Sequence, residues 1–143
     1  MSAGRLLPDD ITDEIAIAST DRRRRIAIAV AALALDALPS RFSELDRALA
    51  AIQSGTRDST TRDLVASVAQ RLDQRYFELY DDEKHGGRSP GWEDAFRAAR
   101  AATALGFAFD DNATAAGADA VLEALHSLGG DLAAIRSTVL STP

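Results

Sequence analysis

The sequence predicts an all-α protein that folds as a compact single-domain bundle of six or seven helices. Apolar residues recur every three or four positions along most of the chain, and no stretch of useful length alternates as a strand does. Ala, a strong helix former, is abundant. The four prolines fall where helices are expected to begin or end: Pro8, Pro39, Pro90 and Pro143.

The length of the chain bounds the number of domains. Its 143 residues match one ordinary domain, and 46% of them are hydrophobic, which is enough for a real core. We therefore expect residues 1–143 to form a single helical domain. Residues 1–8 and 141–143 are expected to fray at its ends.

Residues 9–38 have a helical pattern that fits either one continuous helix or two. The first turn begins near Asp9 or Asp10 and is acidic, which suits the positive end of a helix dipole. Thr20-Asp21 can cap a second helix, and Pro39 ends the segment.

The segment Ile26–Leu35 is apolar on every face, and four arginines, Arg22–Arg25, precede it. This order imitates a secretory signal, but it starts more than twenty residues into the chain and Asp36 interrupts it. Ten apolar residues are also too few to span a bilayer. We expect a buried central helix here. The arginines surround the helix axis, so pairing with acids of neighbouring elements is expected.

The next two helices have clear apolar stripes. Ser40 can cap the first of them, which ends at Gly55. The second opens with Thr60-x-x-Asp63, a variant of the capping box, and runs to about Asp82. Its inward stripe repeats at helical spacing: Val65, Val68, Leu72, Tyr76 and Leu79.

A loop over Lys84–Gly91 separates this helix from the last three. The helix that starts at Trp92 carries small residues on one face, which let a neighbour approach closely, and we expect that neighbour to be the Ile26–Leu35 helix. These residues are Ala99, Thr103 and Gly106. Two shorter helices follow, and Asp131 caps the last of them.

Net charge and composition limit the function. The formal net charge is −6, which disfavours binding to phosphate backbones and to anionic membranes and suits a basic protein partner. The chain has no Cys, so disulfides, zinc–thiolate sites and Cys nucleophiles are excluded. We expect no nucleic-acid partner, no membrane partner and a cytoplasmic location.

Two acid–His pairs are the most specific chemical pattern. Asp82-x-x-His85 and Glu123-x-x-His126 have the spacing that di-iron carboxylate bundles use. The first pair lies at a helix end, and the second lies opposite an apolar stripe, so it is expected to face water. No G-x-S-x-G, Walker or G-x-G-x-x-G motif occurs. We therefore expect no cofactor, no metal and no enzyme activity, with a carboxylate/His metal protein as an alternative.

The densest acidic cluster supplies the candidate binding residues. Acids near a helix C-terminus oppose the helix dipole, which hints that they are kept for a function. Phe77 lies about 120° from the apolar stripe, beside these acids, so it is a candidate aromatic anchor. A second packing contact for Phe77 is the competing interpretation, and Tyr76 and Tyr80 are interpreted as core-edge residues. The predicted partner-binding residues are Phe77, Glu78, Asp81, Asp82 and Glu83.

The segment Trp92-Glu-Asp-Ala-Phe-Arg-Ala-Ala-Arg-Ala-Ala through Asp110-Asp111 resembles small bacterial immunity-type (antitoxin) proteins, which are Ala-rich, acidic, Cys-free and all-helical. The resemblance covers about half of the chain and assigns no individual residue. It implies a non-catalytic protein that neutralises a basic cognate toxin through an acidic helical face. A structural or oligomeric helical protein remains an alternative.

Overall fold

The computed structural model describes residues 7–84 and 91–143, with the side chains of residues 83, 114 and 115 left aside. This described part contains seven helices and no strand, which confirms the predicted all-α single domain. The helices are α1 (Asp9–Ile17), α2 (Thr20–Asp36), α3 (Ser43–Gln53), α4 (Ser59–Lys84), α5 (Trp92–Ala108), α6 (Ala113–Ser127) and α7 (Leu132–Ser141).

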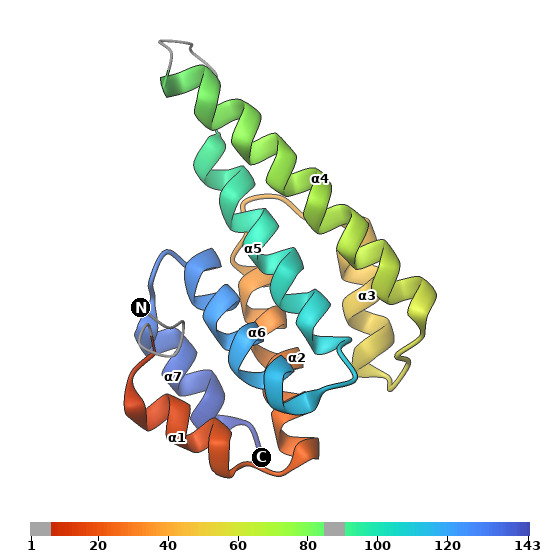
Figure 1. Ribbon diagram of the computed structural model, residues 1–143, viewed down its shortest axis with the longest axis vertical. Helices are drawn as coiled ribbons and strands as arrows, with labels where there is room; N and C mark the ends of the chain where they lie inside the picture. The colour runs from red at the N-terminus through yellow and green to blue at the C-terminus, as the bar shows by residue number, and fades with distance from the viewer. Residues whose placement is uncertain (1–6, 85–90) are drawn as a thin grey trace.

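Helices α2, α5 and α6 contact one another and form the centre of the molecule (Figure 1). Helices α1 and α7 cover one end of this centre, and α3 and α4 lie on the other side. No side chain from Ile26 to Leu35 is exposed, so the expected central helix is confirmed. Because the apolar side chains of α2 point in all directions, several helices must surround it.

Helix α5 uses small side chains to lie close to its neighbours. Five alanines of α5 between residues 98 and 104 are buried. Gly106 faces α4, because a Cβ atom built on it would lie 3.7 Å from Val65 Cγ1. The expectation that Gly106 faces the Ile26–Leu35 helix is therefore wrong. Helix α5 does contact α2.

Residues 9–38 form two helices, which settles the alternative left open by the sequence. Ala18 and Ser19 lie between the two helices, and the Ser19 side chain accepts a hydrogen bond from the Arg22 backbone N–H at 3.2 Å. Ser19 therefore caps α2, one residue before the expected Thr20-Asp21.

Two other predicted caps are also displaced. The carboxylate of Asp58 accepts the Thr61 backbone N–H at 2.7 Å, so Asp58 caps α4 in place of Thr60. Helix α3 begins at Ser43 and has no side-chain cap, so Ser40 does not cap it. The segment between Pro39 and α3 is instead held by Arg41, which pairs with acids on both sides of it.

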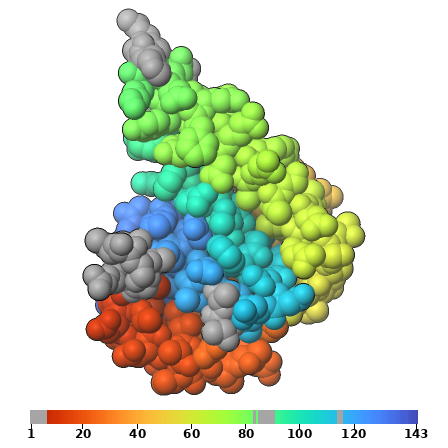
Figure 2. Space-filling view, viewed as in Figure 1, coloured from red at the N-terminus to blue at the C-terminus, as the bar shows by residue number. Residues whose placement is uncertain are grey.

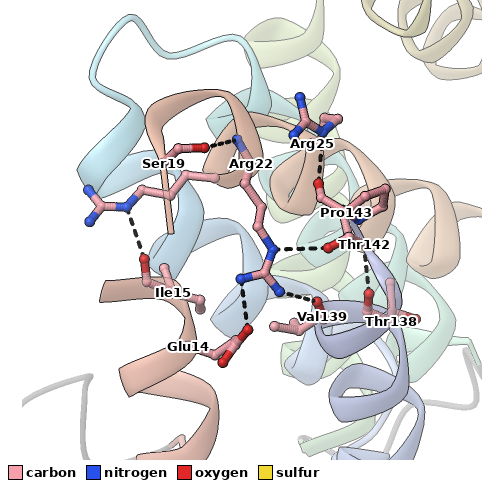
Figure 3. A network of polar contacts seen from close by, with 10 residues as sticks. Glu14, Ile15, Ser19, Arg22, Arg25, Thr138, Val139, Thr142 and Pro143 are labelled. Carbon is pink, nitrogen blue, oxygen red and sulfur yellow. Dashed lines mark hydrogen bonds and ion pairs between the residues drawn. The ribbon is translucent and has the colours of Figure 1, made fainter. Parts of the chain in front are cut away.

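The Arg22–Arg25 run holds the ends of other helices (Figure 3). Arg22 pairs with Glu14 at 2.7 Å and also donates to the carbonyl oxygens of Val139 and Thr142 in and after α7. Arg25 donates to the Pro143 carbonyl at 2.9 Å. The expected acid pair thus occurs at Arg22, while backbone carbonyls take most of the hydrogen bonds described for this run.

The other two arginines act in the same way. Arg23 donates to the Ile15 carbonyl at the end of α1, and Arg24 donates to the Asp111 carbonyl after α5, both at 2.9 Å. Carbonyls at helix C-termini lack partners within the helix and carry partial negative charge, so guanidinium groups suit them. Arg22 and Arg25 thus join residues 142 and 143 to α2.

One pair of helices extends beyond the rest of the molecule. The last fully buried side chains of α4 are Val65 and Val68, although the helix continues to Lys84. We call residues 70–84 of α4 and 92–97 of α5 the arm. Figures 1 and 2 show the arm, in green, projecting from the body formed by the other helices.

Candidate functional site

The predicted partner-binding residues lie on the arm. Phe77, Glu78, Asp81 and Asp82 are all exposed on the last turns of α4, while the side chain of Glu83 lies outside the described residues. The Phe77 side chain is 59% exposed, although its ring lies 4.9 Å from that of Tyr76 in the same helix. Phe77 is therefore available to a partner despite this contact.

An aromatic cluster joins the two helices of the arm. Tyr76 is at its centre, with ring centroids 6.1 Å from Trp92 and 5.1 Å from Phe96 of α5. Tyr80 meets the Trp92 ring edge-on at 5.2 Å and remains 38% exposed. The sequence suggested that these tyrosines lie at the edge of the main core. In the structure they pack against the other rings of the arm. Edge-on and tilted ring contacts of this kind stabilise helix pairing.

The arm also brings together acids from both helices. Residues 77–94 contain six acidic and two basic residues, so they carry four of the six net negative charges of the chain. Glu93 and Asp94 are exposed at the start of α5, and the Tyr80–Trp92 contact places that helix end beside the end of α4. We call the resulting surface the arm-tip patch. Its members are Phe77, Glu78, Tyr80, Asp81, Asp82, Trp92, Glu93 and Asp94.

Four members of this patch were not among the predicted binding residues: Tyr80, Trp92, Glu93 and Asp94. Trp92, Glu93 and Asp94 lie at the start of α5, and only the packing of α5 on α4 brings that helix end beside the end of α4. A usable signal was present, because a short connection between two helices predicts an antiparallel pair whose adjoining ends meet. Glu78, which was predicted, accepts a hydrogen bond from Gln74 at 3.4 Å.

Arg100 fastens the arm to the body. Its guanidinium donates to Asp73 of α4 at 2.6 Å and to Glu123 of α6 at 2.9 Å, and it lies 5.8 Å from the centre of the Phe96 ring. Burial lowers the pKa of Arg100, but the carboxylates of Glu123 and Asp73 outweigh this effect and raise it above its ordinary value. Arg100 therefore stays charged and links three helices.

The sequence predicted that the second acid–His pair faces water, but Glu123 and His126 are both only partly exposed. The Glu123 side chain pairs with Arg100 and is 18% exposed, and His126 lines a surface hollow of about 260 Å³ together with Trp92 and Phe96. His85 of the other pair lies outside the described residues. Within residues 7–84 and 91–143, no group of three or more His, Asp or Glu side chains is placed to hold a metal ion.

A larger groove of about 530 Å³ runs between α4 and α5. Small residues line it, including Ala66, Ala102 and Gly106, together with Phe107. Asp73 lies at the end of the groove nearest the arm tip, and Asp110 and Asp111 lie at the far end. A second hollow of about 360 Å³ lies where Pro39 and Phe42 approach the same two helices. The α4–α5 pair thus presents both the arm-tip patch and this groove.

Comparison with known proteins finds no relative: no protein-family model, no curated protein and no solved structure matches this chain. None of the helices in the described part is both long and apolar enough to cross a membrane. The functional argument therefore rests on the surfaces of the arm.

Proposed function

We propose that this protein is a non-catalytic binding module that captures a basic protein through the arm-tip patch. The observation that carries the proposal is the exposure of Phe77 among carboxylates on a projecting pair of helices. An apolar ring that is 59% exposed costs hydration free energy in the free protein, and a partner that covers it recovers that free energy.

The chemistry of the patch favours a basic partner. Aromatic side chains are frequent energetic anchors in protein interfaces, and carboxylates around them speed the encounter with a positively charged surface. Phe77 and Tyr80 supply the exposed rings, and Glu78, Asp82 and Glu93 supply charge around them. The projection of the arm lets it enter a concave surface that the body is too wide to enter.

Within this class we propose an immunity or antitoxin role, in which the arm covers a basic surface of a toxin. The resemblance of the segment from Trp92 to Asp111 to immunity-type proteins supports this role, as does the concentration of negative charge in residues 77–94. Toxins that act on nucleic acids carry the positive surface that such an arm would neutralise.

Capture of the partner from native lysate tests the binding module. The wild-type protein is expected to retain a basic protein at low salt and to release it at high salt, because salt screens charge attraction. Phe77→Ser and the double variant Asp81→Lys/Asp82→Lys are each expected to abolish capture. The matched control is Asp9→Lys/Asp13→Lys, which changes two exposed acids of α1 by the same charge, far from the arm.

If the arm variants capture the same protein as efficiently as the control, the proposed function is wrong. A mass that rises with protein concentration in light scattering would favour a homo-oligomer instead. The immunity role has its own test, which is co-expression with the gene that precedes it. The role is rejected if that neighbouring gene product is harmless when expressed alone.

A further inference from the structure

The arm is packed differently from the body. Val68 is the last fully buried residue of α4, and Leu72 is the last that packs against the hydrophobic core. Among the arm residues that the structure describes, no side chain is fully buried, whereas Ala120, Val121 and Ala124 of α6 all are. The arm therefore gains less stability from apolar burial than the body does.

Ring contacts hold the two helices of the arm together in place of a core. Tyr76 of α4 contacts Trp92 and Phe96 of α5, and Tyr80 also contacts Trp92. Because both helices contribute to these contacts, each helix loses them when the other unfolds, so the two should open together. Helix pairs with few buried side chains open at a lower free energy than the core of a protein.

Carboxylates at the end of α4 oppose its helical form. Asp81 and Asp82 lie in the last turn and Glu78 lies one turn earlier, while Lys84 is the one basic residue of the last turn. The last carbonyl groups of a helix carry partial negative charge, so nearby carboxylates raise the free energy of the helix. These acids therefore favour the opening of the arm.

Carboxylates at the start of α5 have the opposite effect. Glu93 and Asp94 lie in its first turn, where backbone N–H groups carry partial positive charge. Gly91, which precedes the helix, has no side chain that could cap it. Glu93 and Asp94 therefore stabilise this helix end, although they belong to the same acidic patch as the acids of α4.

We infer that the arm opens as a unit before the body unfolds, and that the acids of α4 promote this opening while Glu93 and Asp94 resist it. A basic partner brings positive charge to the last turns of α4, so it favours the closed arm and orders it on binding. This last step rests on the proposed function. The acids that attract the partner then lower the stability of the free arm, a trade between stability and function.

Amide hydrogen exchange of the full chain tests the inference without a partner. In the wild-type protein, amides of residues 76–84 and 95–97 are expected to have protection factors at least about tenfold lower than those of residues 120–125 in α6. The measurement is made at about 0.15 M salt, where charges more than roughly 8 Å apart are largely screened from one another.

Two charge reversals of equal size separate the helix-end effect from repulsion within the acidic patch. Asp81→Lys/Asp82→Lys is expected to raise the protection factors of the arm at least about threefold, because it places positive charge at a helix C-terminus. Glu93→Lys/Asp94→Lys is expected to lower them at least about threefold, because it places positive charge at a helix N-terminus. Relief of repulsion alone would raise the protection factors in both variants.

Neutral variants of similar shape repeat the comparison if a lysine variant does not fold. Asp81→Asn/Asp82→Asn and Glu93→Gln/Asp94→Asn are expected to shift the protection factors in the same two directions by smaller amounts. Amides of α6 should remain unchanged in every variant. The inference is overturned if the arm of the wild-type protein is as protected as α6, or if the two reversals shift the arm in the same direction.

The outcome is distinguishable from a failure of the proposed function. If the arm opens as expected but Phe77→Ser still captures the partner, the proposed function is wrong and the inference about opening stands. If the arm is as protected as α6 while Phe77→Ser abolishes capture, the inference is wrong and the proposed function stands. In the captured complex, the arm is expected to exchange at least about tenfold more slowly than in the free protein. Unchanged exchange there would overturn the ordering step.

Discussion

The guanidinium of Arg100 in α5 donates a hydrogen bond of 2.6 Å to the carboxylate of Asp73 in α4, near the first residues of the arm. The same guanidinium reaches Glu123 in α6, whose side chain is mostly buried. A helix pair that projects from a protein has little core of its own, so one charged link to the body restricts its orientation. Arg100 therefore ties the base of the arm to α6 in the body.

Arg100→Gln is expected to lower the free energy of unfolding by about 2 kcal/mol, because it leaves the carboxylate of Glu123 partly buried without its charged partner. The measurement is urea denaturation followed by circular dichroism. Arg71→Gln is the matched control, since Arg71 pairs with Glu44 on the exposed surface, where such a pair contributes about 0.5 kcal/mol. Equal losses in the two variants would contradict the role of Arg100.

Arg22 is expected to hold α7 in place. Arg22→Ala removes the ion pair with Glu14 and the hydrogen bonds to the Val139 and Thr142 carbonyls, so we expect a loss of about 2 kcal/mol in unfolding free energy. Amide hydrogen exchange should accelerate in α7 before it does in α5. Arg47→Ala, at an exposed position of α3, is the control. Uniform acceleration across all helices would show that Arg22 has no local role at α7.

Much of the fold could be predicted from the sequence because its strongest patterns are local. The apolar run Ile26–Leu35 and the stripe from Val65 to Leu79 each specify a helix without reference to any other segment. Cap positions were less predictable. Asp58 and Thr60 both have side chains that can cap α4, and the direction from which the chain enters the helix decides between them.

Only the α4 side of the arm-tip patch could be predicted from the sequence. The acids after Phe77 are adjacent in sequence, so they could be recognised as a cluster. Glu93 and the groove residue Gly106 depend on how α5 packs against α4, which no local pattern records. The carbonyl partners of Arg22 were equally hidden, because a sequence does not show which helix C-termini will meet a given side chain.

The aromatic cluster should contribute to stability through Tyr76 and much less through Phe77. Tyr76→Ala removes ring contacts to Trp92 and Phe96 and is expected to cost about 2 kcal/mol, with a red shift in the fluorescence of Trp92, the only tryptophan. Phe77→Ala, at an exposed ring, should cost less than about 1 kcal/mol. If Phe77→Ala lowers the unfolding free energy as much as Tyr76→Ala does, Phe77 is a structural residue and a poor candidate for partner binding.

Acid is expected to destabilise the protein partly through Asp58 and Asp10. The Thr61 backbone N–H lowers the pKa of Asp58, and a hydrogen bond from Arg136 lowers the pKa of Asp10. Because both values are lower in the folded state, this stability is present above the ordinary aspartate pKa of about 3.9 and is lost as the pH falls through the folded-state values.

The pH dependence can be assigned with Asp58→Ser. Serine keeps an oxygen that can cap α4 but does not titrate. The fall in unfolding free energy from about pH 5 to about pH 3, roughly one unit on either side of the ordinary aspartate pKa, should therefore become shallower. Arg136→Met should have a similar effect by releasing Asp10. Unchanged profiles in both variants would place the acid sensitivity in other carboxylates.

Two helical glycines should respond to alanine with opposite signs. Replacing Gly in a helix by Ala gains about 1 kcal/mol when the added methyl group fits, because the unfolded chain loses conformational freedom. At Gly106 the new Cβ would lie 3.7 Å from Val65 Cγ1, an ordinary contact, so Gly106→Ala should raise the midpoint of thermal unfolding. At Gly117 it would lie 3.3 Å from Ile15 Cγ2 and 3.5 Å from Arg23 Cβ, where α1 packs against α6.

Gly117→Ala is therefore expected to be destabilising. Ile15 is buried, and Arg23 is tied by a hydrogen bond to the Ile15 carbonyl, so neither side chain can move away freely and the cost of overpacking, about 1–3 kcal/mol, exceeds the gain in helix propensity. Thermal unfolding of the two variants, measured side by side, gives the signs. If Gly117→Ala were as stabilising as Gly106→Ala, α1 would have to sit more loosely on α6 than the distances to Ile15 and Arg23 indicate.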